Sequence, residues 1–499
     1  MNFLERVNLV LRRDLTLGTL SERLARIHGD RLLVEEEQGT RLTFREAADR
    51  VAMLAAGIKE RIEPGDRVVV AGENDYDFLL VCLAAARAGG VCVPVNPKMR
   101  EEEIEHVITD SGAALVVRDP SEITTNASLD EAVPARPEDV AAIFYTSGTT
   151  GKPKGARLTN RALLSQVAPG AVWPAGLRRD EAVVGLPVAH IMGFVTLLAL
   201  AVSGIPAYFL PHFRANTALD AIEERRATVF VGVPAMYRLM LDAGAEQRDL
   251  RSIRLWMSGA DVLPEDLARR FKRMGATITL PLIGNVGEAS FAEGYGMVEV
   301  AGGVAAKFSP PMLPVGLGDF LGFPLPPYQL KVVDEEGNEV SPGTTGELLV
   351  KGPGVLEGYH DNPEATEETI TPDGWLRTGD MARRGPLGTV FFAGRSKDVI
   401  KHGGYSVFAV EVEATLREHP AVADAAVLGV EDSRKGGEVP VAAIKLAPGA
   451  SATEQELVAW AREHMSDYKA PRQVKIVDEL PRTGTDKVQK AGLRELFTP

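Results

Sequence analysis

A ten-residue segment, residues 146–155 (TSGTTGKPKG), is rich in groups that bind anions. It contains three glycines, four hydroxyl side chains and two lysines, and it follows an apolar run at residues 140–145 that predicts a buried strand. Glycines let backbone N–H groups approach a ligand closely, hydroxyls add donors, and a lysine supplies positive charge, which together suit phosphate oxygens. The P-loop pattern is excluded, because two residues separate Gly148 from Gly151 and Pro153 follows Lys152. The segment therefore predicts phosphate binding, with a surface linker as the plain alternative.

The chain before this segment alternates between strand and helix patterns. Thr43 and Glu46 form a capping-box pattern that predicts a helix over residues 43–58. Further helices are expected at residues 76–88 and 101–110, and strands at 67–71, 91–95 and 114–117. Repeated β-α-β units of this kind predict a mostly parallel sheet covered by helices, so the fold class is α/β.

A second region begins near residue 394. Strands at residues 330–333 and 346–350, joined through a hairpin turn at 335–338, precede it. After it we expect helices at 410–418 and 453–465 and strands at 422–430, 439–446 and 474–477. These elements suffice for a small α+β domain. The predicted domains are residues 1–394 and 395–499.

Composition narrows the class of function. The formal net charge of −14 argues against nucleic acid as a partner, because phosphate backbones bind to basic surfaces. The two cysteines, Cys82 and Cys92, lie in apolar runs and indicate core thiols in a reducing compartment, the cytoplasm. Residues 182–213 carry no Asp, Glu, Lys or Arg, but glycines and prolines divide them into strand, helix and strand. We therefore expect no transmembrane segment there, and the N-terminal residues lack the layout of a signal peptide.

Further short segments follow residues 146–155, the phosphate segment, along the chain. They are PVAHIMG at residues 187–193, VP at 233–234, SGA at 258–260, GYGMVE at 294–299, GWLRTGD at 374–380, GRSKDVIK at 394–401 and PRTGTDK at 481–487. Together they resemble the motifs of the adenylate-forming enzymes, which include acyl-CoA synthetases, luciferases and the adenylation domains of peptide synthetases. The resemblance implies a large N-terminal domain of α/β layers with a distorted β-barrel part and a small mobile C-terminal α+β domain.

The resemblance also implies a reaction in two halves, with ATP, Mg²⁺ and coenzyme A as cofactors. A carboxylate attacks the α-phosphorus of ATP, releases pyrophosphate and gives an acyl-adenylate; a thiol then attacks the activated carbonyl and releases AMP. The first half brings two anions together, so fixed cations and hydrogen-bond donors should carry most of the catalysis. The expected substrate is an apolar acid, either fatty or cyclic.

Nucleotide-binding residues are implied in the same way. Glu299 is expected to hold Mg²⁺, Tyr295 to stack on adenine, and Asp380 and Arg395 to bind the ribose. The full set expected around ATP or AMP is Thr146, Ser147, Gly148, Thr149, Thr150, Gly151, Lys154, Ser258, Gly259, Ala260, Tyr295, Gly296, Met297, Val298, Asp380, Arg395 and Lys487. Outside the motif, Glu299 would be a surface acid and Asp380 a turn residue.

The resemblance also implies that Lys487 is the main catalytic residue, and lysine suits this role because a compact positive charge can follow negative charge as it shifts between oxygens. Glu299 and His190 are the other expected catalytic residues, although a lone histidine in an apolar segment is more often a core residue. Lys397 matches the position at which, in this family, the small C-terminal domain turns relative to the large domain. The expected CoA-binding residues are Lys401, Gly403 and Gly404, and the expected acyl-pocket residues are His190, Phe194, Trp256, Ile283 and Val286.

Three residues depart from the family pattern. Val298 stands where Thr is usual, which removes a hydroxyl expected to bond the α-phosphate. Asp486 replaces a common glycine before Lys487, and Ala189 replaces a common aromatic residue before His190. We expect these departures to affect the rate of the reaction more than the class of enzyme.

Two other functions stay open on the sequence alone. One is an adenylating enzyme that loads the phosphopantetheine arm of a carrier protein. The other is a weakly active or non-catalytic relative that binds a nucleotide or an acyl ligand. The expected partners are a small carboxylic acid, ATP and CoA, and a homodimer is left open.

Overall fold

The predicted β-α-β pattern is present in the computed structural model, which describes residues 14–123, 125–146, 153–172, 179–280, 284–312, 319–402, 405–431, 438–482 and 488–497. The chain divides into two compact units. Unit 1 comprises Met1–Gln329 and Val350–Leu376, and unit 2 comprises Leu330–Leu349 and Arg377–Pro499.

The first sheet of unit 1 carries the strand that leads into the phosphate segment. Its strands lie in the order β19-β7-β6-β4-β3-β5, in which β3, β4, β5 and β6 are parallel and β7 and β19 are antiparallel to their neighbours. The bounds are β3 Arg67–Val70, β4 Val91–Pro94, β5 Leu115–Val117, β6 Val140–Thr146, β7 Lys154–Thr159 and β19 Gly358–Tyr359.

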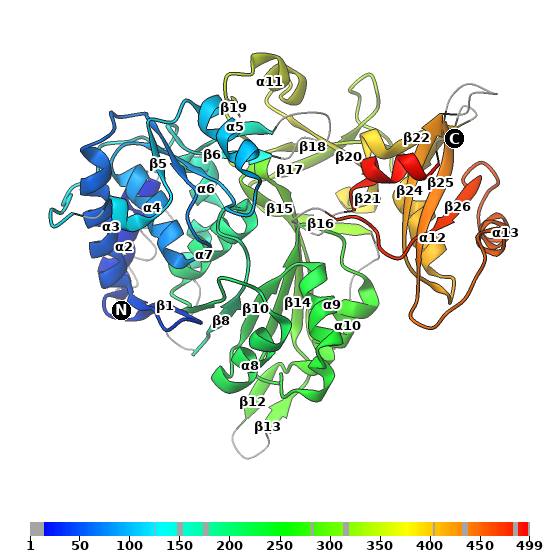
Figure 1. Ribbon diagram of the computed structural model, residues 1–499, viewed down its shortest axis with the longest axis horizontal. Helices are drawn as coiled ribbons and strands as arrows, with labels where there is room; N and C mark the ends of the chain where they lie inside the picture. The colour runs from blue at the N-terminus through cyan, green and yellow to red at the C-terminus, as the bar shows by residue number, and fades with distance from the viewer. Residues whose placement is uncertain are drawn as a thin grey trace. The chain divides into compact units, whose positions relative to one another are not determined.

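Helices α2 (Leu17–His28), α3 (Phe44–Lys59) and α4 (Tyr76–Arg87) pack against one another beside this sheet (Figure 1). The predicted capping box at Thr43 and Glu46 is confirmed, and it begins α3. Helix α5 (Glu101–Ser111) contributes Ile104 and Val107 to a core with strand residues such as Val69. Valine-rich strands thus gain burial from apolar helix faces, as parallel sheets require.

The second sheet of unit 1 has the order β16-β15-β14-β11-β10-β8-β9-β1-β2. Strands β1, β9, β8, β10, β11 and β14 are parallel to their neighbours in that series, whereas β2, β15 and β16 pair antiparallel. The bounds are β1 Leu32–Glu36, β2 Arg41–Thr43, β8 Ala182–Val184, β9 Ala207–Phe209, β10 Val229–Gly232, β11 Leu255–Gly259, β14 Ser290–Met297, β15 Gly302–Ser309 and β16 Phe320–Pro324.

The remaining elements of unit 1 are mostly helices. They are α6 Asn160–Ser165, α7 Ile191–Ser203, α8 Ala215–Arg225, α9 Pro234–Asp242, α10 Glu265–Met274, α11 Pro363–Thr369 and the short 3-10 helix η4 Val298–Val300, with a separate hairpin of β12 Ile278–Leu280 and β13 Gly284–Val286. The strand-helix-strand division predicted for residues 182–213 is confirmed by β8, α7 and β9. None of the helices in the described ranges is long and apolar enough to cross a membrane.

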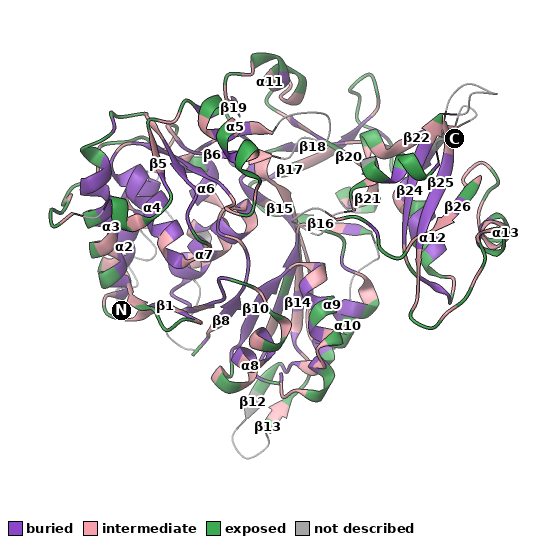
Figure 2. Cartoon of the chain, in the orientation of Figure 1, coloured by how far each residue is buried: buried purple, intermediate pink, exposed green. Residues whose placement is uncertain are grey.

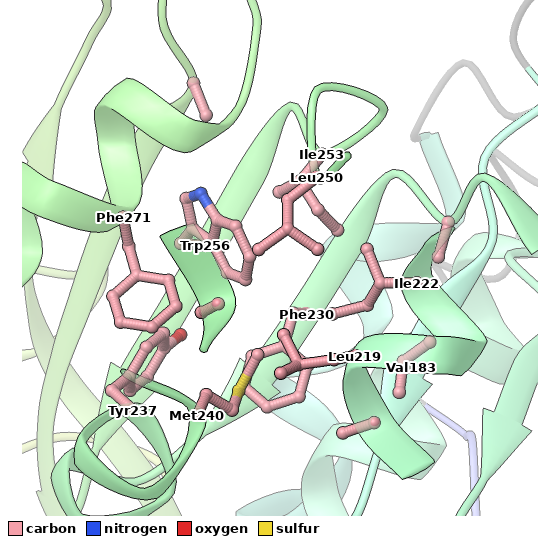
Figure 3. Close-up of a cluster of buried hydrophobic side chains, with 14 of the residues drawn as sticks. Val183, Leu219, Ile222, Phe230, Tyr237, Met240, Leu250, Ile253, Trp256 and Phe271 are labelled. Carbon is pink, nitrogen blue, oxygen red and sulfur yellow. The ribbon is translucent and has the colours of Figure 1, made fainter. Parts of the chain in front are cut away.

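The largest aromatic side chains of this sheet form a core under helices α8, α9 and α10 (Figure 3). Trp256 lies at its centre, with ring centroids 5.0 Å from Phe271 and 5.8 Å from Phe230. Tyr237 joins the same cluster and donates a hydrogen bond to the Met257 carbonyl at 2.7 Å. Edge-to-face packing of this kind stabilises the core on which these strands lie.

The expected barrel is not present as a closed structure among the described strands. The second sheet of unit 1 runs outward from β14 through β15 and β16 and ends at β2 on the other side. It is therefore an open, twisted arrangement, whereas the α/β layers were predicted correctly.

Unit 2 contains four strands in the order β17-β18-β20-β21 and a separate small α+β part. Its strands are β17 Gln329–Val333, β18 Thr345–Lys351, β20 Leu376–Arg384, β21 Val390–Arg395, β22 Val399–His402, β23 Tyr405–Phe408, β24 Val422–Glu431, β25 Glu438–Leu446 and β26 Gln473–Ile476, and its helices are α12 Ala409–Arg417, α13 Glu454–His464 and α14 Lys490–Leu493. Figure 2 shows β24 and β25 largely buried, as expected for the centre of an α+β layer. The elements predicted beyond residue 394 are confirmed, while the domain boundary at that residue stays a prediction.

Candidate functional site

The carboxyl ends of the parallel strands in the two sheets of unit 1 are tied together by one side chain. Asn74, which follows β3, donates from Nδ2 to the Pro211 carbonyl and accepts at Oδ1 from the Val188 N–H, both at 2.8 Å. Pro211 follows β9 and Val188 follows β8. Ligands of open α/β sheets bind at the carboxyl ends of strands, so this is where a site is expected.

The phosphate segment begins and ends at one point of the first sheet. Thr146 at the end of β6 pairs with Lys154 at the start of β7, and its Oγ1 donates to the Lys154 carbonyl at 3.4 Å. The Gly155 carbonyl accepts from the His360 N–H at 2.7 Å, which joins this turn to β19. Ser147, Gly148, Thr149, Thr150 and Gly151 lie outside the described residues.

The second sheet presents two neighbouring strand ends. Gly259 on β11 pairs with Gly294 on β14, and Ser258 is buried beside them. Ala260 follows with a φ of 68°, an unusual conformation for a residue with a Cβ. A Cβ at Gly294 would meet no atom within 4 Å, so the surface above this strand is open. Strain beside an open surface is typical of a binding site.

The chain bends directly after that opening. Tyr295 is half-buried, and the pairing of β14 with β15 shifts register between Tyr295 and Gly296. Gly296 is required there, because a Cβ would lie 1.8 Å from the Gly302 carbonyl oxygen. Met297 ends β14, and Val298 and Glu299 follow in η4, both half-buried.

Three hydrogen bonds hold the η4 turn. The Glu299 carbonyl accepts from the Leu356 N–H at 2.8 Å, and the Val300 carbonyl accepts from Gln166 Nε2 at 2.7 Å. The Tyr359 hydroxyl donates to Glu299 Oε1 at 3.1 Å. Burial and the adjacent Glu299 carboxylate raise the pKa of Tyr359, so this phenol keeps its proton and stays a donor.

Tyr359 also faces the phosphate segment. The Lys154 ammonium nitrogen lies 5.4 Å from the centre of the Tyr359 ring, within the range of a cation–π contact. Lys154 and Glu299 are thus both in contact with Tyr359, although they lie 145 positions apart in the sequence. Neither Tyr359 nor Gln166 was identified from the sequence, because neither lies in a segment chosen for its chemistry.

In unit 2, Asp380 and Arg395 pair directly across the antiparallel strands β20 and β21. Arg395 Nε lies 3.2 Å from Asp380 Oδ1, and the Asp380 side chain is 4% exposed while that of Arg395 is 39% exposed. The Asp380 N–H donates to Thr378 Oγ1 at 3.0 Å, and Thr378 Oγ1 donates to the Leu348 carbonyl at 2.7 Å. The structure therefore brings together the two residues expected at the ribose.

The other predicted residues of unit 2 are described only in part. Lys397 is exposed in a 3-10 helix, Ser396–Asp398, and Lys401 belongs to β22. Gly403, Gly404 and Lys487 lie outside the described residues.

Those predicted acyl-pocket residues that the structure describes do not gather in one place. His190 caps α7, where its Nδ1 accepts from the Met192 N–H at 3.3 Å, and Phe194 is fully buried with its ring 5.3 Å from that of Phe144. Val286 is 41% exposed on the β12–β13 hairpin. Ile283 lies outside the described residues.

Trp256 is removed from the predicted pocket by the alternation of strand β11. Side chains of successive strand residues point to opposite faces, and Trp256 points into the core of Figure 3 with no exposed surface. Met257 and Gly259 share the other face, and a Cβ at Gly259 would lie 3.5 Å from Met192 Sδ. Met257, which is 36% exposed, and Met192 are therefore better candidates for apolar walls. The period-2 pattern of residues 255–259 places Trp256 and Met257 on opposite faces, but it leaves open which of the two faces the core.

Comparison with known proteins agrees with this architecture. The model of the AMP-binding enzyme family matches residues 21–360, and that of the AMP-binding enzyme C-terminal domain matches residues 411–487. A feruloyl-CoA synthase of an Amycolatopsis species is 34% identical, over 97% of this chain and 100% of the relative.

A second relative and a solved structure extend the comparison. The 3-[(3aS,4S,7aS)-7a-methyl-1,5-dioxo-octahydro-1H-inden-4-yl]propanoyl:CoA ligase of Mycobacterium tuberculosis is 33% identical, over 93% of this chain and 95% of the relative. The crystal structure of ATP-bound MatB from Rhodopseudomonas palustris superposes with a TM-score of 0.85 at 29% identity, over 97% of this chain and 99% of that one. This chain belongs to the family of AMP-binding enzymes.

Proposed function

We propose that the chain is an ATP-dependent carboxylic acid–CoA ligase that works through an acyl-adenylate. The observation that carries the proposal is the family match over residues 21–360, which contain both the phosphate segment and the Glu299 turn. Two relatives that are named as CoA synthase or ligase align with nearly the whole chain, and this supports the same reaction type.

Adenylation is assigned to groups at the strand ends of unit 1. Thr146 and Lys154, with Ser147–Gly151 between them in sequence, bind the β- and γ-phosphates. Tyr295 stacks on adenine beside Ser258, Gly259 and Ala260, while Gly296 and Met297 complete the backbone around the nucleotide. Bound Mg²⁺ supplies positive charge at the phosphates. Glu299 fits this ion, because Mg²⁺ in nucleotide sites takes one or two carboxylates and receives its remaining ligands from phosphates and water.

Residues of unit 2 complete the proposal. Asp380 accepts hydrogen bonds from the ribose hydroxyls, and Arg395, whose Nε lies 3.2 Å from Asp380 Oδ1, supplies positive charge beside that buried carboxylate. Lys487 places its ammonium at the oxygens that gain negative charge during adenylation. Lys397 is the hinge about which residues 395–499 turn afterwards, so that Lys401, Gly403 and Gly404 receive the pantetheine arm of CoA.

The proposed substrate is an apolar acid with a ring or a fatty chain. Met192 and Met257 offer flexible thioether walls near the opening above Gly294, and methionine adapts to irregular shapes. The relatives named above act, by their names, on a feruloyl and a bicyclic propanoyl group, which supports a cyclic acid. We assign His190, the N-cap residue of α7, to the boundary between the acyl pocket and the path by which the thiol of CoA enters.

A cytoplasmic location and a homodimer belong to the proposal as well. Cys82 and Cys92 are buried free thiols, which suits a reducing compartment. Light scattering of the purified chain tests the dimer, and a monomer mass at working concentration contradicts it.

The function is tested by two assays on one panel of acids that differ in chain length and ring content. Carboxylate-dependent exchange of labelled pyrophosphate into ATP reports adenylation, and AMP release is measured with CoA or with a phosphopantetheine-bearing carrier protein as the acceptor. We expect exchange with cyclic or fatty acids and AMP release with CoA. Faster AMP release with the carrier protein would reassign the acceptor. Absence of exchange for every acid, together with no Mg·ATP binding by calorimetry, would overturn the proposed function.

A further inference from the structure

Tyr359 contacts one residue on each side of the proposed triphosphate site. Its hydroxyl donates to Glu299 Oε1 at 3.1 Å, and Lys154 Nζ lies 5.4 Å from the centre of its ring. We propose that Tyr359 is a positioning residue, which holds the Glu299 carboxylate and the Lys154 ammonium in one fixed arrangement for a metal-bound triphosphate. This inference rests on the proposed function, since it assigns Glu299 to the metal and Lys154 to the phosphates.

The backbone around Tyr359 fixes where the ring lies. In the pairing of β19 with β7, Tyr359 stands opposite Ala156, two positions beyond Lys154. Its N–H donates to Thr366 Oγ1 at 2.9 Å, and Thr366 Oγ1 donates to the Asn362 carbonyl at 2.8 Å at the start of α11. The residue is only 9% exposed, so the ring has little freedom to leave this position.

The same segment holds the backbone of the Glu299 turn. The Leu356 N–H donates to the Glu299 carbonyl at 2.8 Å. Close packing continues at Gly354, where a Cβ would lie 2.4 Å from the Val300 carbonyl oxygen and 2.1 Å from the Tyr328 hydroxyl. Residues 354–360 therefore bridge the end of the phosphate segment and the η4 turn within unit 1.

The hydroxyl and the ring of Tyr359 have separable effects. The terminal torsion of a glutamate is broad, so a hydrogen bond to one carboxylate oxygen restricts the orientation in which the group meets a cation. Preorganisation of this kind raises affinity by lowering the ordering cost of binding. The ring instead attracts the Lys154 ammonium, which acts on the phosphates whether or not a metal is present.

Calorimetry of ATP binding without acid separates the two effects. The probes are Mn·ATP, with Mn²⁺ as a substitute for Mg²⁺, and metal-free ATP in EDTA. For Tyr359→Phe we expect Mn·ATP affinity to fall roughly tenfold, as a lost hydrogen bond to a charged group predicts, and metal-free ATP affinity to stay within about twofold. Tyr359→Leu also removes the ring, so it should weaken both probes.

Matched variants exclude a general loss of structure. Glu299→Gln should weaken Mn·ATP, and Tyr359→Phe added to it should cause little further loss, because both changes act on one contact. Tyr237→Phe removes the hydrogen bond from a core tyrosine that does not touch Glu299, and it should keep the affinity for Mn·ATP. If Tyr359→Phe folds poorly in a melting scan, Glu299→Asp serves instead, since it keeps the charge but withdraws the carboxylate from the hydroxyl.

The outcomes distinguish this inference from the proposed function. Should the unmodified chain bind neither probe, the proposed function fails and the inference fails with it. Should the unmodified chain prefer Mn·ATP and Tyr359→Phe keep that preference undiminished, the inference alone is overturned. Equal loss of both probes in Tyr359→Phe, or full additivity with Glu299→Gln, would likewise contradict it.

Discussion

Units 1 and 2 position their proposed nucleotide-binding residues in different ways. In unit 1 these residues follow parallel strands, so that Thr146 ends β6 and Gly259 ends β11, in two different sheets. In unit 2, Asp380 and Arg395 are direct partners across the antiparallel pair β20–β21. Strand topology therefore gathers residues in unit 1, whereas strand register fixes a single pair in unit 2.

The difference has an energetic consequence. A strand-end site in unit 1 is held by several backbone contacts, such as those of Leu356 and Gln166 to the η4 turn, and no single side chain carries them all. The buried Asp380 carboxylate in contrast has Arg395 as a close cationic neighbour. Loss of one partner of a buried ion pair leaves the other poorly compensated. We therefore expect changes in unit 2 to have the larger individual effects.

The largest effect is expected from Lys487→Ala. Adenylation should fall by about 10²–10³-fold, as for removal of one oxyanion-type donor, while thioester formation from supplied acyl-adenylate should change much less. Pyrophosphate exchange and AMP release from the isolated adenylate measure the two halves. Lys490→Ala is the matched control, because Lys490 pairs with Glu413 at 2.8 Å and should leave both rates near normal. Equal loss in both halves would contradict the role and leave adenylation to unit 1.

The second largest effect is expected at the pair Asp380 and Arg395, which lie opposite each other on β20 and β21. Asp380→Asn should raise the KM for ATP by roughly 10–100-fold, because hydrogen bonds to a charged group contribute about 1.5–3 kcal/mol. Glu347→Gln is the control, since Glu347 pairs with Arg377 across β18 and β20 at 2.6 Å without a proposed ligand role. Steady-state kinetics at fixed concentrations of acid and CoA measure the KM for ATP. A similar rise in KM for both variants would mean that the Asp380–Arg395 pair is only structural.

Sequence patterns were sufficient for the framework that carries these residues. The capping box of α3 and the valine-rich strand β3 appear as predicted, because local hydrogen bonding and burial on both faces determine them. These features depend on neighbours in the sequence, so a single chain reveals them.

Features that depend on distant segments were not predictable. Trp256 was expected at a pocket wall because it is apolar and close to the 258–260 motif, yet the strand turns it into the core. Tyr359 was missed because its contacts with Glu299 and Lys154 arise only when β19 pairs with β7. Which face of a strand meets which neighbour is a tertiary property, and strand periodicity leaves two choices.

A smaller effect is expected from Val298→Thr in η4, directly after β14. A restored hydroxyl beside the α-phosphate should raise adenylation roughly tenfold, as one hydrogen bond of about 1.5 kcal/mol to a charged group predicts. Val286→Thr, on the exposed β13, is the matched control and should leave the rate unchanged. Pyrophosphate exchange is the measurement. An unchanged rate for Val298→Thr would show that another group of unit 1 already donates to the α-phosphate. Unit 1 would then tolerate the absence of a hydroxyl at position 298.

The smallest effect concerns the stability of the folded chain and arises at the carboxyl end of β3 in the first sheet. Asp75 caps α4 after β3, and burial raises its pKa to about 6, with Asp77 and Glu36 adding to the rise and the Phe78 N–H and Arg50 opposing it. Between pH of about 4 and 6 the folded chain therefore binds a proton that the unfolded chain has released, so stability falls as pH rises through this window. Asp75→Asn does not titrate and caps a helix equally well.

Asp75→Asn should consequently raise the free energy of unfolding by about 1–2 kcal/mol at pH 8, after allowance for partial exposure, and the gain should vanish near pH 4. The urea midpoint followed between these pH values measures it. Asp119→Asn is the control of opposite sign, since the Ser121 N–H lowers the pKa of Asp119 and its removal should cost stability at pH 8. A higher free energy of unfolding for Asp75→Asn at pH 8 would show that burial of the charged Asp75 carboxylate destabilises unit 1. Asp380 differs, because Arg395 lies beside its carboxylate. A loss would show that the charged cap of α4 outweighs the burial that raises its pKa.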